Sequence, residues 1–336
     1  MKRANVNGSP QNQYCGFICL RIAGAALGYV RKKGGADTWG GFSFIREPAL
    51  IALLVWAYLV VLCTSLALAS LATRLAFHIS YDGQHLVPAI LSVAALSCFA
   101  FLLARCEFSF GYFASFYFLT VIGGYLWLSY FTPLEYDQNT SRWSAAASFL
   151  AFALPAILIT RSPIRMPALT TSQMDRLAIG LLAATALLLA YGAYYGPQPR
   201  FPKWMNYALS ISAGALVPFA YAWFTFRKTF ILASAALLVS AAFYPITLTK
   251  TALLCPVWLI FLTLLLRVCR PRIAVVLSLF IPLFVGVLTF GLEPPDRKII
   301  FGVINIRMLA IPASALDHYY HFFRRMPLQT SVRCPW

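Results

Sequence analysis

A single lysine stands near the middle of a long apolar stretch. Between Thr229 and Leu266 the residues are apolar or weakly polar, and Lys250 is the only charged one. At about 1.5 Å per residue, one helix over this stretch would be roughly 57 Å long, whereas the hydrocarbon core of a bilayer is about 30 Å thick. The stretch must therefore fold back on itself, with a turn near residues 247–251 that puts Lys250 at or slightly inside a membrane boundary.

A cation at that depth has two interpretations. Charges at membrane depth are costly and by default mark functional sites. The aliphatic stem of a lysine can also carry its ammonium group out to the headgroups, which would make Lys250 a boundary residue only. The local sequence leaves both interpretations open.

The composition indicates a polytopic membrane protein. Hydrophobic residues make up 60% of the 336 residues and charged ones 11%, against about 25% charged in a soluble domain. The hydropathy pattern predicts an all-α, transmembrane helix bundle of about nine spans over residues 48–291, between a cytoplasmic segment, 1–47, and an outside segment with short amphipathic helices, 292–336. The spans are expected near 48–73, 86–104, 109–131, 143–160, 177–195, 207–226, 229–249, 251–266 and 273–291.

The basic residues follow this topology. If the N-terminus is cytoplasmic, sixteen of the 27 Lys and Arg residues fall on the cytoplasmic side and five in the outside loops before residue 292. The positive-inside rule selects that orientation. The net charge of +17 is therefore interpreted as a topology signal, and no nucleic-acid partner is expected.

Several kinds of chemistry have no signal in the sequence. All ten acidic residues fall in predicted connections or at span ends, whereas proton- and sodium-coupled transporters commonly place carboxylates within the membrane. The eight cysteines are scattered without metal-ligand spacing, so neither a metal site nor a disulfide framework is expected. No phosphate-binding loop, HExxH or GxSxG pattern occurs, and no cofactor is predicted.

The segment after residue 292 gathers cations, histidines and aromatic residues. Such a surface suits a ligand that joins phosphate to sugar, because arginine binds phosphate in a fixed fork and aromatic rings stack on sugars. An amphipathic segment lying on the membrane is an equally good interpretation. Two histidines three positions apart form a weak metal pair, because no third ligand is evident. The candidate ligand contacts are Arg297, Lys298, Arg307, Asp317, His318, Tyr319, Tyr320 and His321.

Two passages together resemble one family. Residues 249–254 read Thr-Lys-Thr-Ala-Leu-Leu and resemble the Ser-Lys-Ser/Thr-Ala-Leu/Ile-Leu element of bacterial oligosaccharide repeat-unit polymerases, the O-antigen polymerase (Wzy-like) family. Residues 307–312, Arg-Met-Leu-Ala-Ile-Pro, followed by His-Tyr-Tyr-His-Phe-Phe at 318–323, resemble that family's later Arg-x-x-x-x-Pro…Tyr-Tyr-x-Phe-Phe region. The resemblance covers residues 249–323, and the order of the two passages also matches.

The resemblance implies a bacterial inner-membrane glycosyltransferase of polysaccharide and lipopolysaccharide biosynthesis. Such an enzyme joins oligosaccharide units carried on undecaprenyl pyrophosphate at the periplasmic face. Lys250 and Arg307 would bind the pyrophosphate from one outside-opening cavity, and Asp317 or His318 would take the acceptor proton. Arg297, Lys298, Tyr319, Tyr320 and His321 would contact substrate.

Two alternatives accompany this hypothesis. Family members continue with further spans after this region, whereas this sequence ends at Trp336, which suggests a C-terminally truncated member. A non-enzymatic flippase or exporter of lipid-linked glycans, or a membrane protein without catalysis, would show the same composition. Cations lining a cavity across the whole bilayer would favour the flippase.

Overall fold

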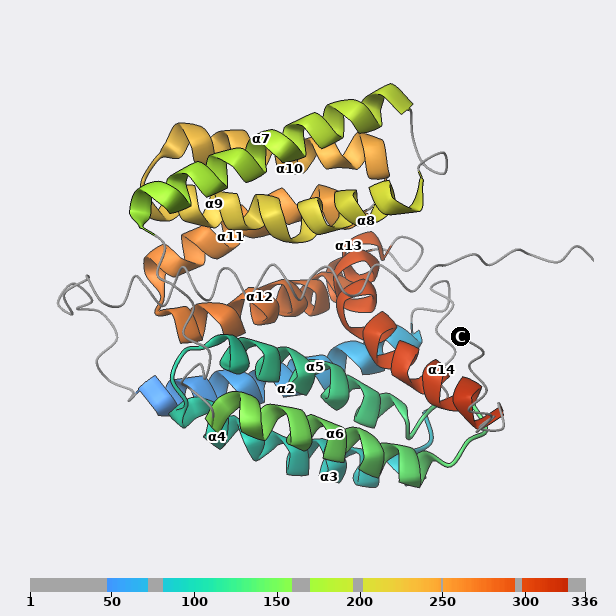
Figure 1. Cartoon of the computed structure of the whole chain (residues 1–336). Helices are drawn as coiled ribbons and strands as arrows, with labels where there is room; N and C mark the ends of the chain where they lie inside the picture. Colours follow the sequence, from blue (N-terminus) through green and yellow to red (C-terminus); the bar gives the residue numbers. More distant parts are fainter. Residues whose placement is uncertain are drawn as a thin grey trace, which may run out of the picture. The chain divides into compact units, whose positions relative to one another are not determined.

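The computed structural model describes residues 47–71, 81–158, 170–195, 202–248, 250–293 and 298–325. Every regular element in these ranges is a helix (Figure 1), which confirms the all-α prediction. Of the expected N-terminal segment, only Glu47 lies within the described residues.

Within the described residues, eight helical segments are long and apolar enough to cross a membrane, and they coincide with eight of the nine predicted spans. The chain is therefore a multi-pass membrane protein whose helices contact lipid. The other predicted span corresponds to helix α11 (Lys250–Val268), in which residues 252–268 form a shorter apolar helix.

The chain divides into two compact units, so the predicted bundle of residues 48–291 consists of two parts. The first unit contains α7 (Thr171–Tyr195), α8 (Lys203–Ile211), the π-helix η3 (Ser212–Leu216), α9 (Val217–Phe226), α10 (Phe230–Thr247) and α11. The second unit contains α2 (Glu47–Leu71), α3 (Gly83–Ser97), α4 (Phe99–Arg105), α5 (Phe110–Leu128), α6 (Gln138–Leu158), α12 (Pro271–Leu292), α13 (Ile299–Phe301), the π-helix η4 (Gly302–Ala310) and α14 (Ile311–Arg325).

The first unit is built around α9. This helix packs against α7 and α10, and it buries Trp223 and Phe224. The indole Nε1 of Trp223 donates to Asp175 Oδ1 at 2.7 Å, and Arg227 pairs with the same carboxylate at 3.4 Å. Asp175 and Arg227 stand near the ends of their helices, where polar groups reach water or headgroups at little cost.

The helix break predicted near Lys250 is confirmed. Helix α10 ends at Thr247, and its C-cap residue Leu248 has φ 50°, in the left-handed region. Helix α11 begins at Lys250, two residues after Leu248. A helix that ends in the left-handed conformation changes direction there, so the long apolar stretch forms two helices.

Close backbone approaches hold the second unit together. An added Cβ on Gly111 of α5 would lie 1.8 Å from the carbonyl oxygen of Ala156 on α6. One on Gly124 of α5 would lie 3.1 Å from Ala313 Cβ on α14. Small residues let membrane helices pack backbone to backbone, so α5 can contact α6 and α14 together.

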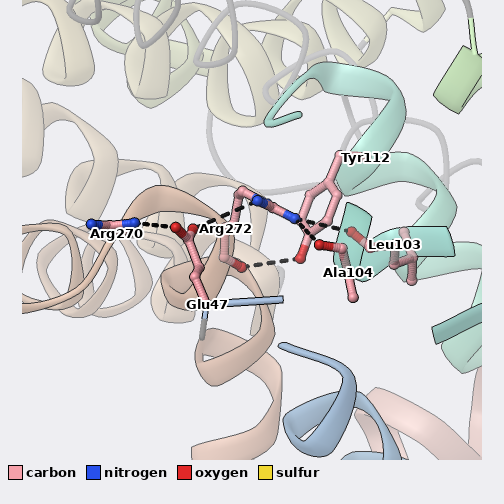
Figure 2. Close-up of polar contacts among 6 residues, drawn as sticks. All are labelled: Glu47, Leu103, Ala104, Tyr112, Arg270 and Arg272. Atoms are coloured by element: carbon pink, nitrogen blue, oxygen red, sulfur yellow. Dashed lines mark hydrogen bonds and ion pairs between the residues drawn. The ribbon is translucent and has the colours of Figure 1, made fainter. Parts of the chain in front are cut away.

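A polar cluster joins the first and last spanning helices of the second unit (Figure 2). Figure 2 shows the Glu47 carboxylate of α2 between two guanidinium groups, one from Arg270, the N-cap residue of α12, and one from Arg272 within that helix. Arg272 also donates to the carbonyl oxygens of Leu103 and Ala104 near the end of α4, and its own carbonyl accepts from Tyr112 Oη at 3.2 Å. These contacts bring α2, α4, α5 and α12 together at one end of the unit.

The C-terminal segment returns to the bundle after α12. Lys298 Nζ donates to the carbonyl oxygens of Phe290 and Glu293, and Glu293 Oε1 accepts from the backbone N–H of Ile300 at 3.0 Å. Beyond this corner α13, η4 and α14 follow one another without a break, and in Figure 1 they pass the right-hand ends of α2 and α5. Packing of η4 on α2 and α12, and of α14 on α5, makes the segment part of the second unit.

Candidate functional site

Asp317 is a buried carboxylate near the middle of α14, with 5% of its surface exposed. Its Oδ2 accepts a hydrogen bond from Thr132 Oγ1 at 2.6 Å, and its Oδ1 accepts one from Tyr136 Oη. Thr132 and Tyr136 belong to the connection between α5 and α6, and they precede Asp317 by 185 and 181 residues in the sequence, respectively. Because a buried polar group is costly unless it is hydrogen-bonded, these two hydroxyl groups offset the cost of burying the Asp317 side chain.

Three tyrosines surround this carboxylate. The Tyr320 ring stacks on Tyr125, with centroids 5.5 Å apart, and on Tyr136, with centroids 6.5 Å apart. The hydroxyl groups of Tyr125 and Tyr136 are 3.3 Å apart. Tyr320 Oη donates to Ser144 Oγ on α6 at 3.4 Å. The stack therefore joins α5, α6, α14 and the α5–α6 connection around Asp317.

In the hydrogen bond between Tyr136 and Asp317, the tyrosine hydroxyl donates and the carboxylate accepts. Burial, followed by the hydrogen bond with Asp317, raises the pKa of Tyr136 well above its ordinary value. Tyr136 therefore keeps its proton and donates it in the hydrogen bond. Each carboxylate oxygen has two lone pairs, so Asp317 retains acceptor capacity for a further hydroxyl group.

Arg142 of α6 holds the start of the same connection. Its Nε donates to Ser129 Oγ at 2.8 Å, one terminal nitrogen donates to the Ser129 carbonyl oxygen at 2.6 Å, and its guanidinium carbon lies 3.5 Å from the Tyr130 ring centroid. The Ser129 carbonyl lies at the C-terminal end of α5, where a cation is favourable. Arg142 thus anchors the segment that carries Thr132 and Tyr136.

The other candidates on α14 occupy different surroundings. His318 and Tyr319 are exposed, and His321 is half-buried. Tyr319 stacks on Phe323 with centroids 6.3 Å apart. Within the part of the chain that the structure describes, no three His, Cys, Asp or Glu side chains are grouped as a metal site would need.

The structure describes the four candidate cations to different extents. Lys298 uses its ammonium group at the end of α12, where it also lies 4.0 Å from the Phe290 ring centroid. Arg307 is in η4, ten positions before Asp317 on the same continuous helical segment, and its side chain lies outside the description. Arg297 lies outside the described residues. Lys250 opens α11 in the first unit, whereas Arg307 belongs to the second, so their shared cavity stays a prediction.

Sequence reasoning missed the residues that contact Asp317. No role at the site was predicted for Thr132 and Tyr136, nor for Arg142, which anchors the segment that carries them. The available signal was a threonine and a tyrosine in a short connection after an aromatic-rich span. This pattern does not identify Asp317 as the partner of Thr132 and Tyr136, because it carries no information about how α14 packs.

No family model matches the chain, and neither a curated protein nor a solved structure matches it.

Proposed function

We propose that this protein is a membrane glycosyltransferase that joins oligosaccharide repeat units carried on undecaprenyl pyrophosphate. The reaction would take place at the periplasmic face of a bacterial inner membrane. The proposal rests on the resemblance of residues 249–254 and 307–323 to repeat-unit polymerases. The structural observation that carries it furthest is the buried, hydroxyl-bound carboxylate of Asp317 within the second of those passages.

The proposed reaction transfers a glycosyl group to a hydroxyl. The acceptor oxygen attacks the anomeric carbon of the donor, the bond from that carbon to the pyrophosphate oxygen breaks, and undecaprenyl pyrophosphate leaves with the bonding electrons. The hydroxyl proton passes to the base. Asp317 is favoured over His318 as that base, because Asp317 is fixed by two hydrogen bonds and His318 is exposed.

The leaving group needs positive charge. Lys250 and Arg307 are the proposed ligands of the pyrophosphate, with Arg297 and Lys298 as further contacts. Cations placed in advance in a water-poor site stabilise charge that develops in the transition state. Tyr319, Tyr320 and His321 would position sugar or lipid, and the stacked ring of Tyr320 is oriented by Tyr125 and Tyr136.

Deletion and complementation in the source cell test this function. Cells without the protein should keep single lipid-linked repeat units and lose long glycan chains, and the wild-type gene should restore the chains. Lys250→Ala should fail to restore them at an unchanged protein level, whereas Lys250→Arg should restore them in part, because a guanidinium only partly replaces an ammonium. Normal chain length in deleted cells, or in cells with Lys250→Ala, would exclude the proposal.

A further inference from the structure

The C-terminal segment buries a carboxylate and leaves several large apolar side chains open. In α14, Ala313 and Asp317 are buried and Tyr320 is half-buried. Phe322 is 51% exposed and Phe323 is 64% exposed. The other large apolar residues exposed on this C-terminal segment are Ile300, Val303, Ile311 and Tyr319.

This arrangement is the reverse of what water favours. A helix on an aqueous surface buries its aromatic rings, because each square ångström of apolar surface removed from water contributes about 25 cal/mol, and it exposes its carboxylates. In hydrocarbon the preference inverts, and ionisable groups turn toward the bundle interior. The buried carboxylate of Asp317 and the uncovered apolar side chains of the segment therefore indicate a lipid environment.

Asn305 fixes the depth of the preceding π-helix. Its side-chain Nδ2 donates to Ser65 Oγ on α2 at 2.8 Å and to the Leu283 carbonyl oxygen on α12 at 3.1 Å. Ser65 and Gly286, which faces the same amide, each lie six positions before the last residue of their helices. At about 1.5 Å per residue, Asn305 is roughly 9 Å below the ends of two spanning helices.

From that depth α14 runs back to the α5–α6 connection. Asp317 reaches Thr132 and Tyr136, which follow the end of α5. The exposed apolar residues between Ile300 and Asp317 thus fall between the level of Asn305 and that of the connection.

We propose that α13, η4 and α14 form a re-entrant membrane segment whose open face contacts the acyl chains of the leaflet at this end of the second unit. Asn305 is its anchor within the bundle, and the exposed side chains of Val303 and Ile311 are its lipid surface. Re-entrant segments are stable where neighbouring parts of the protein satisfy their polar groups. Here α2 and α12 accept from Asn305 Nδ2, and the α5–α6 connection donates to Asp317. This inference goes beyond the proposed function and does not require it.

Collision measurements on a spin label test the lipid surface. The full-length chain, with its native cysteines replaced, would be labelled at Ile311→Cys and reconstituted into phosphatidylcholine vesicles. Oxygen reports access from lipid and a water-soluble nickel chelate reports access from water. Leu288→Cys, on an exposed position of α12, is the lipid control, and Glu135→Cys, on an exposed position of the α5–α6 connection, is the water control. All variants must elute from a sizing column as the wild type does.

The label at residue 311 should have the oxygen-to-nickel ratio of residue 288, several-fold above that of residue 135. A ratio equal to that of residue 135 would place α14 in water and overturn the proposal. A label that neither reagent reaches would show that protein covers this face, which also overturns it. If replacing the native cysteines prevents folding, a photoreactive benzophenone at position 311 of the otherwise unchanged chain replaces the label. Attachment to phospholipid is then expected, and attachment only to protein contradicts the proposal.

Discussion

Gly286 of α12 and Asn305 of η4 approach so closely that an added Cβ at residue 286 would lie 1.7 Å from Asn305 Oδ1. That oxygen is buried and has no hydrogen-bond partner among the described residues, whereas the amide nitrogen has two. Flipping the amide would turn its oxygen toward the Leu283 carbonyl, which also only accepts hydrogen bonds. The observed orientation is therefore fixed, and residue 286 must lack a side chain.

Replacement of Gly286 by Ala should destabilise the protein. A new methyl group would displace Asn305 and break its hydrogen bonds to α2 and α12, and overpacking of this kind costs about 1–3 kcal/mol. Gly291→Ala is the matched control, because it lies on the same helix with nothing within 4 Å of its Cβ position. There the exchange should be neutral or stabilising by up to about 1 kcal/mol. Thermal unfolding in detergent measures both, and equal melting temperatures would contradict the close approach.

The two arginines of the Glu47 cluster should differ in their contribution to stability. Arg272 has 17% of its side chain exposed and donates to α4, whereas Arg270 has 61% exposed. Arg270→Gln should cost about 0–1 kcal/mol, as at a surface pair. Arg272→Gln should cost more, toward the about 3–5 kcal/mol of a buried pair that loses one partner. Unfolding free energies of the two purified variants check this order, and an equal loss would show that Arg272 does not hold the cluster.

The spanning helices could be predicted from the sequence because hydropathy is a local property. The break before Lys250 followed from length alone, since one helix of that stretch exceeds the bilayer. The association of α2 with α12 through Glu47 and Arg272 could not be predicted, because nothing near either residue specifies a partner. The close approach of Gly286 to Asn305 could not be predicted either, because a glycine in an apolar run has many possible explanations.

From the sequence, the candidate site around Asp317 could be predicted only within the C-terminal segment that contains it. The sequence singled out Asp317 and Tyr320 because they stand in an unusual group of polar and aromatic residues. It did not show that Asp317 is buried or that Thr132 and Tyr136 bind it, because these contacts depend on how α14 packs on α5. The π-helical geometry around Asn305 and Arg307 also depends on packing.

The contribution of Tyr136 to stability should depend on pH at alkaline values. Its pKa is raised in the folded protein by burial and by Asp317, whereas an unfolded tyrosine titrates near 10. The stabilisation is therefore fully present below about pH 10 and declines above it, by up to about 1.4 kcal/mol per pH unit. Between pH 8 and pH 11 the melting temperature of the wild type should fall more than that of Tyr136→Phe. Parallel curves would mean that Tyr136 titrates alike in both states.

The orientation in the membrane can be tested with reporter fusions. The asymmetry of Lys and Arg predicts a cytoplasmic location for a reporter joined after Arg165 and an outside location for one joined after Asp296. An alkaline phosphatase reporter should be inactive at the first site and active at the second. The same reporter activity at both sites would refute the predicted topology.

The length of the glycan made by cells that carry Asp317→Asn tests the central claim most directly. The amide keeps the shape of the carboxylate but cannot take up the acceptor proton. Glu135→Gln, at an exposed position of the α5–α6 connection, is the control for loss of a carboxylate near the site. At equal protein levels, Asp317→Asn should leave only single repeat units, and Glu135→Gln should give the wild-type ladder of chain lengths. A wild-type ladder from Asp317→Asn would contradict the assignment of Asp317 as the base.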